Sequence, residues 1–267
     1  MRTYPGISLI VSTYNWPQAL DLCLKSIKDQ TLLPDEIIIA DDGSTLETRA
    51  LIEKHQEDFP VPLIHIWQED NGFQLSRIRN KAIVKTTTEY IIQIDGDLIL
   101  GRHFIQDHIN FIKPQSFVSG TRVQMSQELS LKLITDQSTN VRLTSKGLTN
   151  LSNALRVPVL SHFLANKYKA GDPTSVRGCN MAFWKSDLLC VNGYDESISG
   201  WGREDSELAI RLINAGIKKR MLKFGAVAFH IYHNEAERNR LHANDAILEK
   251  SINKGTKVCE IGLSQYL

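Results

Sequence analysis

The sequence predicts an α/β domain built on a mostly parallel β-sheet with helices on both faces. Two observations favour this fold class. Apolar runs of strand length recur along residues 7–94, and amphipathic helical segments separate them. Strands that read as continuous apolar runs, without alternation of apolar and polar residues, are typical of a sheet that is covered on both faces.

Four apolar runs in this part of the chain are expected to form strands. They are rich in isoleucine, leucine and valine, which are favoured in buried strands. The four expected strands are residues 7–11, 36–40, 63–67 and 90–94. Residues 226–233 form a further run with strand character in the second half of the chain.

Helices are expected between these strands. Pro17 suits a first helical turn, and the apolar residues after it recur with the spacing of one helix face. These residues are Leu20, Cys23, Leu24 and Ile27, and Ile78, Ala82 and Ile83 repeat the pattern before the fourth strand. In such α/β sheets, ligands bind beyond the carboxyl ends of the strands.

Polar residues follow three of the strands at that edge. The first strand leads into Ser12-Thr13-Tyr14-Asn15, the second into Asp41-Asp42-Gly43-Ser44 and the fourth into Asp95-Gly96-Asp97. Any one of these segments could be an ordinary turn, since Asp, Asn and Gly are common turn residues. Their convergence at one edge favours a shared nucleotide pocket.

The triplet Asp95-Gly96-Asp97 is a candidate metal site. Hard cations such as Mg²⁺ and Mn²⁺ take oxygen ligands and usually keep open positions that substrate phosphates fill. The alternative is a turn that ends the strand, and acidic triplets also arise by chance.

His230 is a candidate ligand from a distant segment. Neutral imidazole is a common ligand for metals of the Mn²⁺ class, so this histidine would complete a site begun by Asp97. A histidine near the surface with no ligand role is the alternative. His233 lies three residues later in the same run and is a second choice for the ligand.

Residues 200–207 read Gly-Trp-Gly-Arg-Glu-Asp-Ser-Glu, directly before a helical pattern. The helix dipole favours acidic residues in a first turn, which would explain one or two of these carboxylates without any function. It does not explain Trp201 between Gly200 and Gly202. A large aromatic side chain on a glycine-hinged loop is typical of a substrate platform that moves.

Residues 125–169 form a polar stretch in which the periodicity weakens. A helix-like patch surrounds Leu151, Leu155, Leu160 and Leu164. We expect a substrate-facing insertion or lid here.

The 267 residues are 42% hydrophobic and 23% charged, which is typical of a globular protein with one sizeable domain or two small ones. A net charge of +1 gives no case for nucleic-acid binding. The region 218–257 is basic and could approach an anionic membrane surface or a polyanionic substrate, although a solvated helix face is an alternative of at least equal weight. Its cations are Lys218, Lys219, Arg220, Lys223, Arg238, Arg240, Lys250, Lys254 and Lys257.

The four cysteines, Cys23, Cys179, Cys190 and Cys259, are scattered without a C-x-x-C pair, which indicates a reducing cytoplasm. The apolar run near the N-terminus is too short for a signal-peptide core, and no run approaches the roughly 20 apolar residues of a membrane span. We expect a cytoplasmic protein, with peripheral contact at the inner membrane face left open.

The combination of these motifs resembles the inverting glycosyltransferases of family two, which have the GT-A fold. The resemblance rests in the first half on Val11-Ser12-Thr13-Tyr14-Asn15, Asp41-Asp42-Gly43-Ser44, Arg79-Asn80 and Asp95-Gly96-Asp97. From Arg177 to about Arg211 the chain is similar to the galactosyltransferase region shared by β-1,4-galactosyltransferases and chondroitin-type polymerases. The resemblance implies a half at 1–120 that binds the nucleotide-sugar and a half at 121–235 that binds the acceptor and carries catalysis. A basic helical tail at 236–267 would follow.

The resemblance also implies roles for single residues on the nucleotide side. Tyr14 and Asp42 would meet the uracil ring, and Thr13 and Asn15 would line its pocket. Arg79 would contact the carboxylates or the diphosphate. Asp95 would lie near the ribose or the donor sugar, while Asp97 and His230 would bind the metal, Mn²⁺ or Mg²⁺.

On the acceptor side, the resemblance implies that Trp201 is the aromatic residue of a mobile loop that includes Gly202. Glu204 would bind sugar hydroxyls and Asp205 would be the catalytic base. Arg203 departs from the family pattern, in which a second glycine is usual at this position.

These roles imply a metal-dependent single displacement that inverts the anomeric carbon. The donor would be a UDP-sugar, with Gal or GalNAc favoured, and the acceptor a saccharide or lipid-linked saccharide in surface polysaccharide or lipopolysaccharide synthesis. A nucleotidyltransferase is less favoured, because residues 12–18 lack a glycine-rich phosphate loop with a basic residue. A protein that binds UDP-sugar or carbohydrate without catalysis is the remaining alternative.

Overall fold

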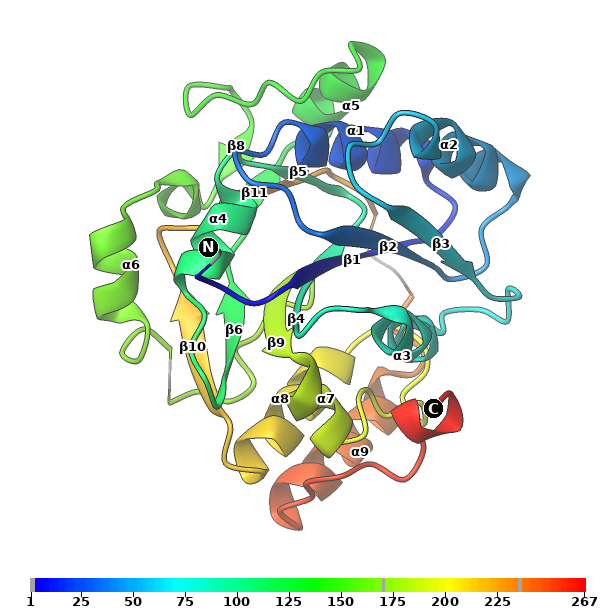
Figure 1. Ribbon diagram of the computed structural model, residues 1–267, viewed down its shortest axis with the longest axis vertical. Helices are drawn as coiled ribbons and strands as arrows, with labels where there is room; N and C mark the ends of the chain where they lie inside the picture. Colours follow the sequence, from blue (N-terminus) through cyan, green and yellow to red (C-terminus); the bar gives the residue numbers. More distant parts are fainter. Residues whose placement is uncertain (1–2, 170, 235–236) are drawn as a thin grey trace.

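A mostly parallel, seven-stranded sheet forms the centre of the computed structural model, which describes residues 3–169, 171–234 and 237–267 (Figure 1). Its strands are, in spatial order, β10 (Lys218–Leu222), β6 (Ser116–Gly120), β9 (Asn180–Trp184), β4 (Tyr90–Asp95), β1 (Ile7–Thr13), β2 (Glu36–Asp41) and β3 (Leu63–Trp67). Only β9 runs antiparallel to its neighbours in this sheet. The expected α/β class and the four expected strands are confirmed.

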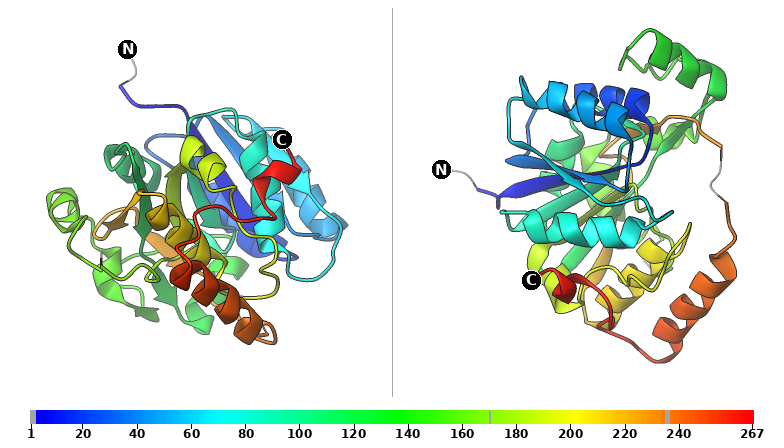
Figure 2. Two further views of the ribbon diagram at one scale, coloured as in Figure 1. Left: turned by 90° about the horizontal axis from the view of Figure 1, so that it is seen from below. Right: turned by 90° about the vertical axis from the view of Figure 1, so that its right-hand side faces the viewer.

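Helices cover both faces of this sheet, as Figures 1 and 2 show. Side chains of β1 alternate between the faces, so that Leu9 and Val11 lie in one core and Ile10 in the other. The first core is closed by α1 (Pro17–Lys28), α2 (Leu46–Gln56) and α4 (Phe104–Asn110). The second is closed by α3 (Leu75–Lys85), α7 (Lys185–Cys190) and α8 (Glu204–Asn214).

The sequence pattern predicted α1 and α3 for the correct physical reason. Pro17 occupies the first turn of α1, where its missing N–H costs no hydrogen bond. Leu20, Cys23 and Ile27 are fully buried against the sheet. Each such side chain contributes roughly 1.5–3 kcal/mol through its burial.

A smaller sheet, which the sequence did not predict, lies beside the central one. Its strands are β5 (Leu98–Leu100), β11 (Ala228–His230), β7 (Val123–Met125) and β8 (Leu148–Thr149). The expected strand at 226–233 is too long, because the strand in the structure covers only Ala228–His230. Ala226 has a φ of 44°, and the Tyr232 amide donates to Ser130 Oγ, so the chain leaves the sheet on both sides of β11.

The polar stretch contains α5 (Gln127–Thr135), a 3₁₀ turn η1 (Leu151–Ala154) and α6 (Pro158–Leu164). The expected helix-like patch of leucines is therefore divided between η1 and α6. Pro158 cannot continue the first helix and instead begins the second.

The chain ends with α9 (Leu241–Asn253), which packs on α8, and with η2 (Leu263–Gln265). The expected boundary between residues 235 and 236 lies outside the described residues. The basic region does not form one surface, because Lys219, Arg220 and Lys223 are buried. In the described part of the chain, no helix has the length and apolar character to cross a membrane.

Candidate functional site

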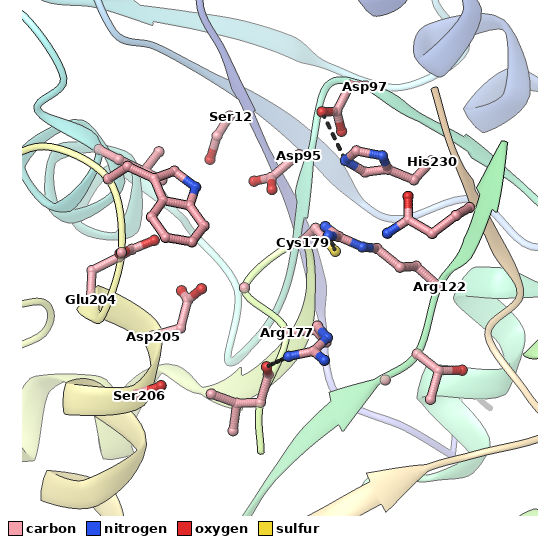
Figure 3. A pocket seen from close by; sticks show the side chains of 18 of the residues that line it. Ser12, Asp95, Asp97, Arg122, Arg177, Cys179, Glu204, Asp205, Ser206 and His230 are labelled. Atoms are coloured by element: carbon pink, nitrogen blue, oxygen red, sulfur yellow. Dashed lines mark hydrogen bonds and ion pairs between the residues drawn. The ribbon is translucent and has the colours of Figure 1, made fainter. Parts of the chain in front are cut away.

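A cavity of about 1280 Å³ opens at the carboxyl ends of β1, β2 and β4. Side chains from both halves of the sequence line it, including the end of β4, the segment before β9 and the start of α8 (Figure 3). The topology explains this meeting. Because β9 lies beside β4 and runs antiparallel to it, the segment that precedes β9 lies at the edge where β4 ends.

Nearly all of the predicted site residues line this one cavity. They are Thr13, Tyr14, Asp42, Arg79, Asp95, Asp97, Trp201, Gly202, Glu204, Asp205 and His230. The exception is Asn15, whose side chain accepts a hydrogen bond from the Thr45 amide at 2.8 Å. Asn15 therefore ties the turn after β1 to the start of α2.

Arg79 of α3 links the two halves of the cavity. Its guanidinium, 1% exposed, donates to Asp95 Oδ1 at the end of β4 and to Asp205 Oδ1 on α8, both at 2.9 Å. Its Nε donates to Ser12 Oγ at 3.3 Å. A buried guanidinium is costly without such partners, so this hydrogen bonding fixes both carboxylates in the cavity wall.

Glu204 stands next to Asp205 at the start of α8. Burial and the negative charge of Asp205 together raise the pKa of Glu204 to about 8, against the opposing effect of Arg79. Glu204 Oε1 lies 3.9 Å from an Arg79 nitrogen, and among the described residues Glu204 Oε2 has no hydrogen-bond partner. The neutral acid can therefore donate a hydrogen bond into the cavity at neutral pH.

Gly178, in the segment before β9, provides space for Asp205. A Cβ atom at this position would lie 1.8 Å from Asp205 Oδ2 and 2.2 Å from its Cγ. No residue with a side chain fits here while Asp205 keeps its position.

The loop before α8 has an unusual backbone. Gly200, Gly202 and Arg203 have φ angles of 72°, 100° and 81°. Glycine adopts such angles without strain, whereas arginine does not. Arg203 is held there by an ion pair with Asp245 of α9. Trp201 in this loop is 37% exposed, and its ring packs under the Arg238 guanidinium at 4.8 Å.

Glu207, the third acidic residue of this region, has a structural environment. Glu207 and Arg211 form an ion pair at 2.7 Å in which neither side chain is exposed. Arg211 also donates to the carbonyl oxygens of Val191 and Gly193, and Glu207 accepts from Ser251 of α9. This pair fastens α8 to its neighbours.

Asp97, His230 and His233 form a group that could hold a metal ion. Their ligand atoms lie within 4.8 Å of one another, and both imidazole Nε2 atoms are 3.3 Å from Asp97 Oδ2. Burial acts to raise the pKa of Asp97, but the two histidines outweigh it and hold the pKa below its usual range. Asp97 Oδ1 is buried without a hydrogen-bond partner in the described part of the chain. One carboxylate and two imidazoles fit a metal of the Mn²⁺ class.

The turns after β1 and β2 form another part of the cavity wall. Both oxygens of Asp42 accept hydrogen bonds, from Gln68 Nε2 at 2.6 Å and from the Gln74 amide at 2.8 Å. Burial raises the pKa of Asp42 to about 6 in spite of these bonds. Tyr14 is half exposed and donates to Asp70, which leaves its ring face accessible.

Another part of the wall is basic. Lys169, Arg177 and Lys223 line the cavity there, and none of them makes an ion pair with a carboxylate in the described residues. Lys223 is buried, and its hydrogen bonds within the described part of the chain go to the neutral oxygens of Ser152 and Asn153. Burial lowers the pKa of Lys223, and the like charge of Lys169 adds to this effect.

Sequence reasoning missed Gly178, Arg122 and the joint role of both histidines at Asp97. Arg122 lies between Cys179 and the Asp97 group, and its pKa is raised by the Cys179, Asp95 and Asp97 side chains despite burial (Figure 3). No local signal could have indicated Arg122 or Gly178. The spacing of His230 and His233 was visible, but a regular strand would have pointed them to opposite faces.

The cavity thus combines several ionisable carboxylates, a candidate metal site and an open edge at the turns after β1 and β2. Such an arrangement can accept a proton, bind a diphosphate and orient two substrates.

Comparison with known families agrees with this description. Residues 8–189 match the model of glycosyl transferase family 2, and residues 160–234 match a model described as the N-terminal domain of galactosyltransferase. The first match covers more than half of the chain and includes the turns after β1, β2 and β4.

Curated relatives are similar over most of this chain. Chondroitin synthase of Pasteurella multocida strain Pm70 is 28% identical over 244 residues, which are 84% of this chain and 24% of that protein. Validoxylamine A glucosyltransferase of Streptomyces hygroscopicus subsp. limoneus is 25% identical over 259 residues, 90% of this chain and 55% of that protein. The chain therefore spans between a quarter and about half of the length of these relatives.

Solved structures share the fold. S. aureus TarS 1-349 in complex with UDP superposes with a TM-score of 0.64 at 15% identity, over 97% of this chain and 68% of that one. The mannosyltransferase PcManGT from Pyrobaculum calidifontis, in complex with GDP-Man and Mn²⁺, gives 0.59 at 17% identity, over 95% and 72%. The family match shows that the chain belongs to glycosyltransferase family 2, and the likeness to these solved structures shows that it has the GT-A fold.

Proposed function

We propose that this protein is an inverting glycosyltransferase that moves a sugar from a UDP-sugar to a saccharide acceptor. One observation carries the proposal. A single buried guanidinium, that of Arg79, holds Asp95 on the donor side and Asp205 on the acceptor side of one cavity. This geometry suits a direct displacement, in which donor and acceptor must meet in one place.

Asp205 is the proposed base. Its carboxylate takes the proton of an acceptor hydroxyl as that oxygen attacks the anomeric carbon. The bond from this carbon to the UDP oxygen breaks on the opposite face, so the configuration inverts. A positioned base contributes ~10²–10⁴-fold to such a rate. Gly178 and Arg79 keep Asp205 in place.

Asp97, His230 and His233 would hold the metal, Mn²⁺ or Mg²⁺. When bound, the cation supplies Lewis-acid stabilisation of the charge on the leaving diphosphate. The two imidazoles favour Mn²⁺, because Mg²⁺ prefers oxygen ligands.

The turns after β1 and β2 are the proposed nucleotide site. Thr13 and Tyr14 line it, and Tyr14 offers its exposed ring to the uracil base. Asp42 either accepts a hydrogen bond from the uracil ring or holds the Gln68 side chain and the Gln74 backbone amide in place around that ring. Asn15 supports this turn through Thr45.

Glu204 and Trp201 are the proposed sugar contacts. Glu204 has the raised pKa of a group that can donate as well as accept hydrogen bonds to sugar hydroxyls. Trp201, beside Gly202, provides an aromatic platform. We favour Gal or GalNAc as the donor sugar because of the galactosyltransferase match at residues 160–234.

The basic wall faces the acceptor in this proposal. Lys169, Arg177 and Lys223 favour an acceptor that carries carboxylate or phosphate groups, since these cations have no carboxylate partner among the described residues. Synthesis of a surface polysaccharide or lipopolysaccharide would supply such an acceptor.

The test is UDP release with Mn²⁺ across a panel of UDP-sugars, with and without saccharide acceptors. We expect slow release without an acceptor, faster release with a matched pair, and loss of release when EDTA removes the metal. The variant D205N should keep UDP affinity and lose about 10²–10⁴-fold in turnover. Full activity of D205N would exclude Asp205 as the base. UDP binding without any release would favour a non-catalytic binding protein.

A further inference from the structure

Residues 137–171 have an unusual charge pattern. This stretch contains no Asp or Glu, and its cations are Arg142, Lys146, Arg156, Lys167 and Lys169. Arg156 pairs with Asp107 at 2.7 Å. The other four are exposed and form no ion pair within the described residues. The nearest acidic residue after the stretch, Asp172, bonds to its own turn at Thr174 and Ser175.

The same stretch exposes large apolar side chains around α6. Six of them fall within residues 151–163, namely Leu151, Leu155, Val157, Val159, Leu160 and Phe163. Val159 and Phe163 are 83% and 61% exposed. They lie one helical turn apart and therefore share a face of α6. The Lys167 ammonium lies 3.7 Å from the Phe163 ring centroid, so charge and apolar surface are adjacent.

The position of α6 leaves this surface free. It packs on β10 at the rim of the molecule, outside the central sheet, in both Figure 1 and the left view of Figure 2. Isolated exposed apolar residues need no explanation, but six within thirteen residues, with Val159 and Phe163 on one face of α6, indicate an interaction surface.

The charges indicate which partner fits. A two-fold contact with a second copy would bring the same unpaired cations together across the interface, and they would repel one another. Exposed apolar side chains beside unpaired cations, as Phe163 lies beside Lys167, are the complement of an anionic bilayer surface, where the apolar groups enter the headgroup layer and the cations meet lipid phosphates.

We propose that residues 137–169 dock the protein on an anionic membrane, with Val159 and Phe163 inserted into the headgroup region. Tyr168 and Lys169 of the same stretch also line the cavity. Docking therefore brings the cavity mouth to the bilayer surface. If the proposed transfer reaction holds, the acceptor is carried on a lipid.

The experiment is sedimentation of the full chain with phosphatidylcholine vesicles that contain or lack about one-third phosphatidylglycerol. We expect binding to the anionic vesicles only, weakened by salt because the attraction is partly electrostatic. V159S/F163S should weaken binding at least tenfold through lost apolar insertion. K146Q/K167Q should weaken it about ten- to thirtyfold at low salt.

The matched control is L46S/V258S, which removes two exposed apolar side chains elsewhere on the surface. It should bind vesicles like the unaltered protein. UDP release without vesicles should be the same in all three variants, so a failure of docking is distinct from a failure of the proposed reaction. Equal binding by V159S/F163S, or no binding to anionic vesicles, would overturn the proposal. A change of oligomeric state in V159S/F163S without vesicles would point instead to a second copy.

Discussion

At the residue scale, the cavity depends on positions whose side chains are small or held by many partners. Gly178 leaves room for Asp205, and Arg79 fixes the direction of its carboxylate. Neither property is visible in the local sequence, because both depend on contacts with residues that are distant in the sequence.

Replacing Gly178 with alanine should disturb Asp205 without unfolding the chain. The φ of Gly178 lies outside the left-handed region, so alanine is allowed there by the backbone and only its Cβ meets Asp205. We expect G178A to lose at least tenfold in turnover while it keeps UDP affinity. G171A, at a glycine with nothing within 4 Å, is the control and should stay active. Equal activity of both variants would show that Asp205 has room to move.

His108 should make the fold sensitive to acid. It is fully buried, and its Nε2 must donate to Asn180 Oδ1, because the Asn180 amide nitrogen already donates to Thr121 and Ala226. Burial lowers the pKa of His108 to about 4, against weaker opposing effects of Asn180 and Asp107. The unfolded chain therefore binds a proton that the folded chain does not, between about pH 6.5 and 4.

The free energy of unfolding should fall through this window as the pH decreases, by up to about 1.4 kcal/mol per pH unit from this histidine. Urea unfolding of the protein and of H108Q at several pH values measures the difference. The stability of H108Q should fall less steeply, whereas H162Q, at an exposed histidine, should follow the unaltered protein. Parallel curves for H108Q and the unaltered protein would contradict this account.

At the element scale, α8 has two functions that its sequence does not separate. Its first turn carries Glu204 and Asp205 into the cavity, while Glu207 and Arg211 one turn later anchor it to α9 and to the loop after α7. The helix dipole alone therefore does not explain why all three acidic residues are present.

Breaking this anchor should destabilise the protein strongly. Because Glu207 and Arg211 are both fully buried, R211M leaves an uncompensated charge and should cost about 3–5 kcal/mol. The double variant E207L/R211M should cost less than the sum of the two single changes, as coupled residues do. The exposed pair Arg49 and Glu53 on α2 has the same spacing, and R49M should change stability by less than about 1 kcal/mol. Denaturant unfolding of these variants is the measurement.

At the scale of the whole molecule, the two halves of the sequence share one sheet. β9, from the second half, pairs with both β4 and β6 of the first. Removal of the second half would take both neighbours, β9 and β10, from β6 and would leave β4 paired only with β1. We therefore expect the halves at 1–120 and 121–235 to be parts of one folding unit.

Unfolding should accordingly occur in one transition. Trp16 and Trp67 report on the first half, and Trp184 and Trp201 on the second. Variants with a single tryptophan in either half should show urea midpoints that coincide with each other and with circular dichroism. Separate midpoints would indicate two independent domains.

The sequence by itself determined the α/β class, the strands before the acidic turns, and the family. Strand and helix periodicities are local properties, and the turns after β1, β2 and β4 meet wherever parallel strands share an edge. Nearly all of the site residues predicted from these patterns and from the family resemblance line the cavity, although they are only part of its wall.

Only the tertiary structure decided what these residues do to one another. Arg79 joining Asp95 to Asp205, the space beside Gly178, and the approach of His230 and His233 to Asp97 all involve residues far apart in the sequence. Asn15 and Glu207 carry the same residue types as the site, yet their partners give them structural environments. The small sheet around β11 was likewise hidden, because its strands are too short to show a period. Burial and pairing are set by packing, and packing is not a local property of the chain.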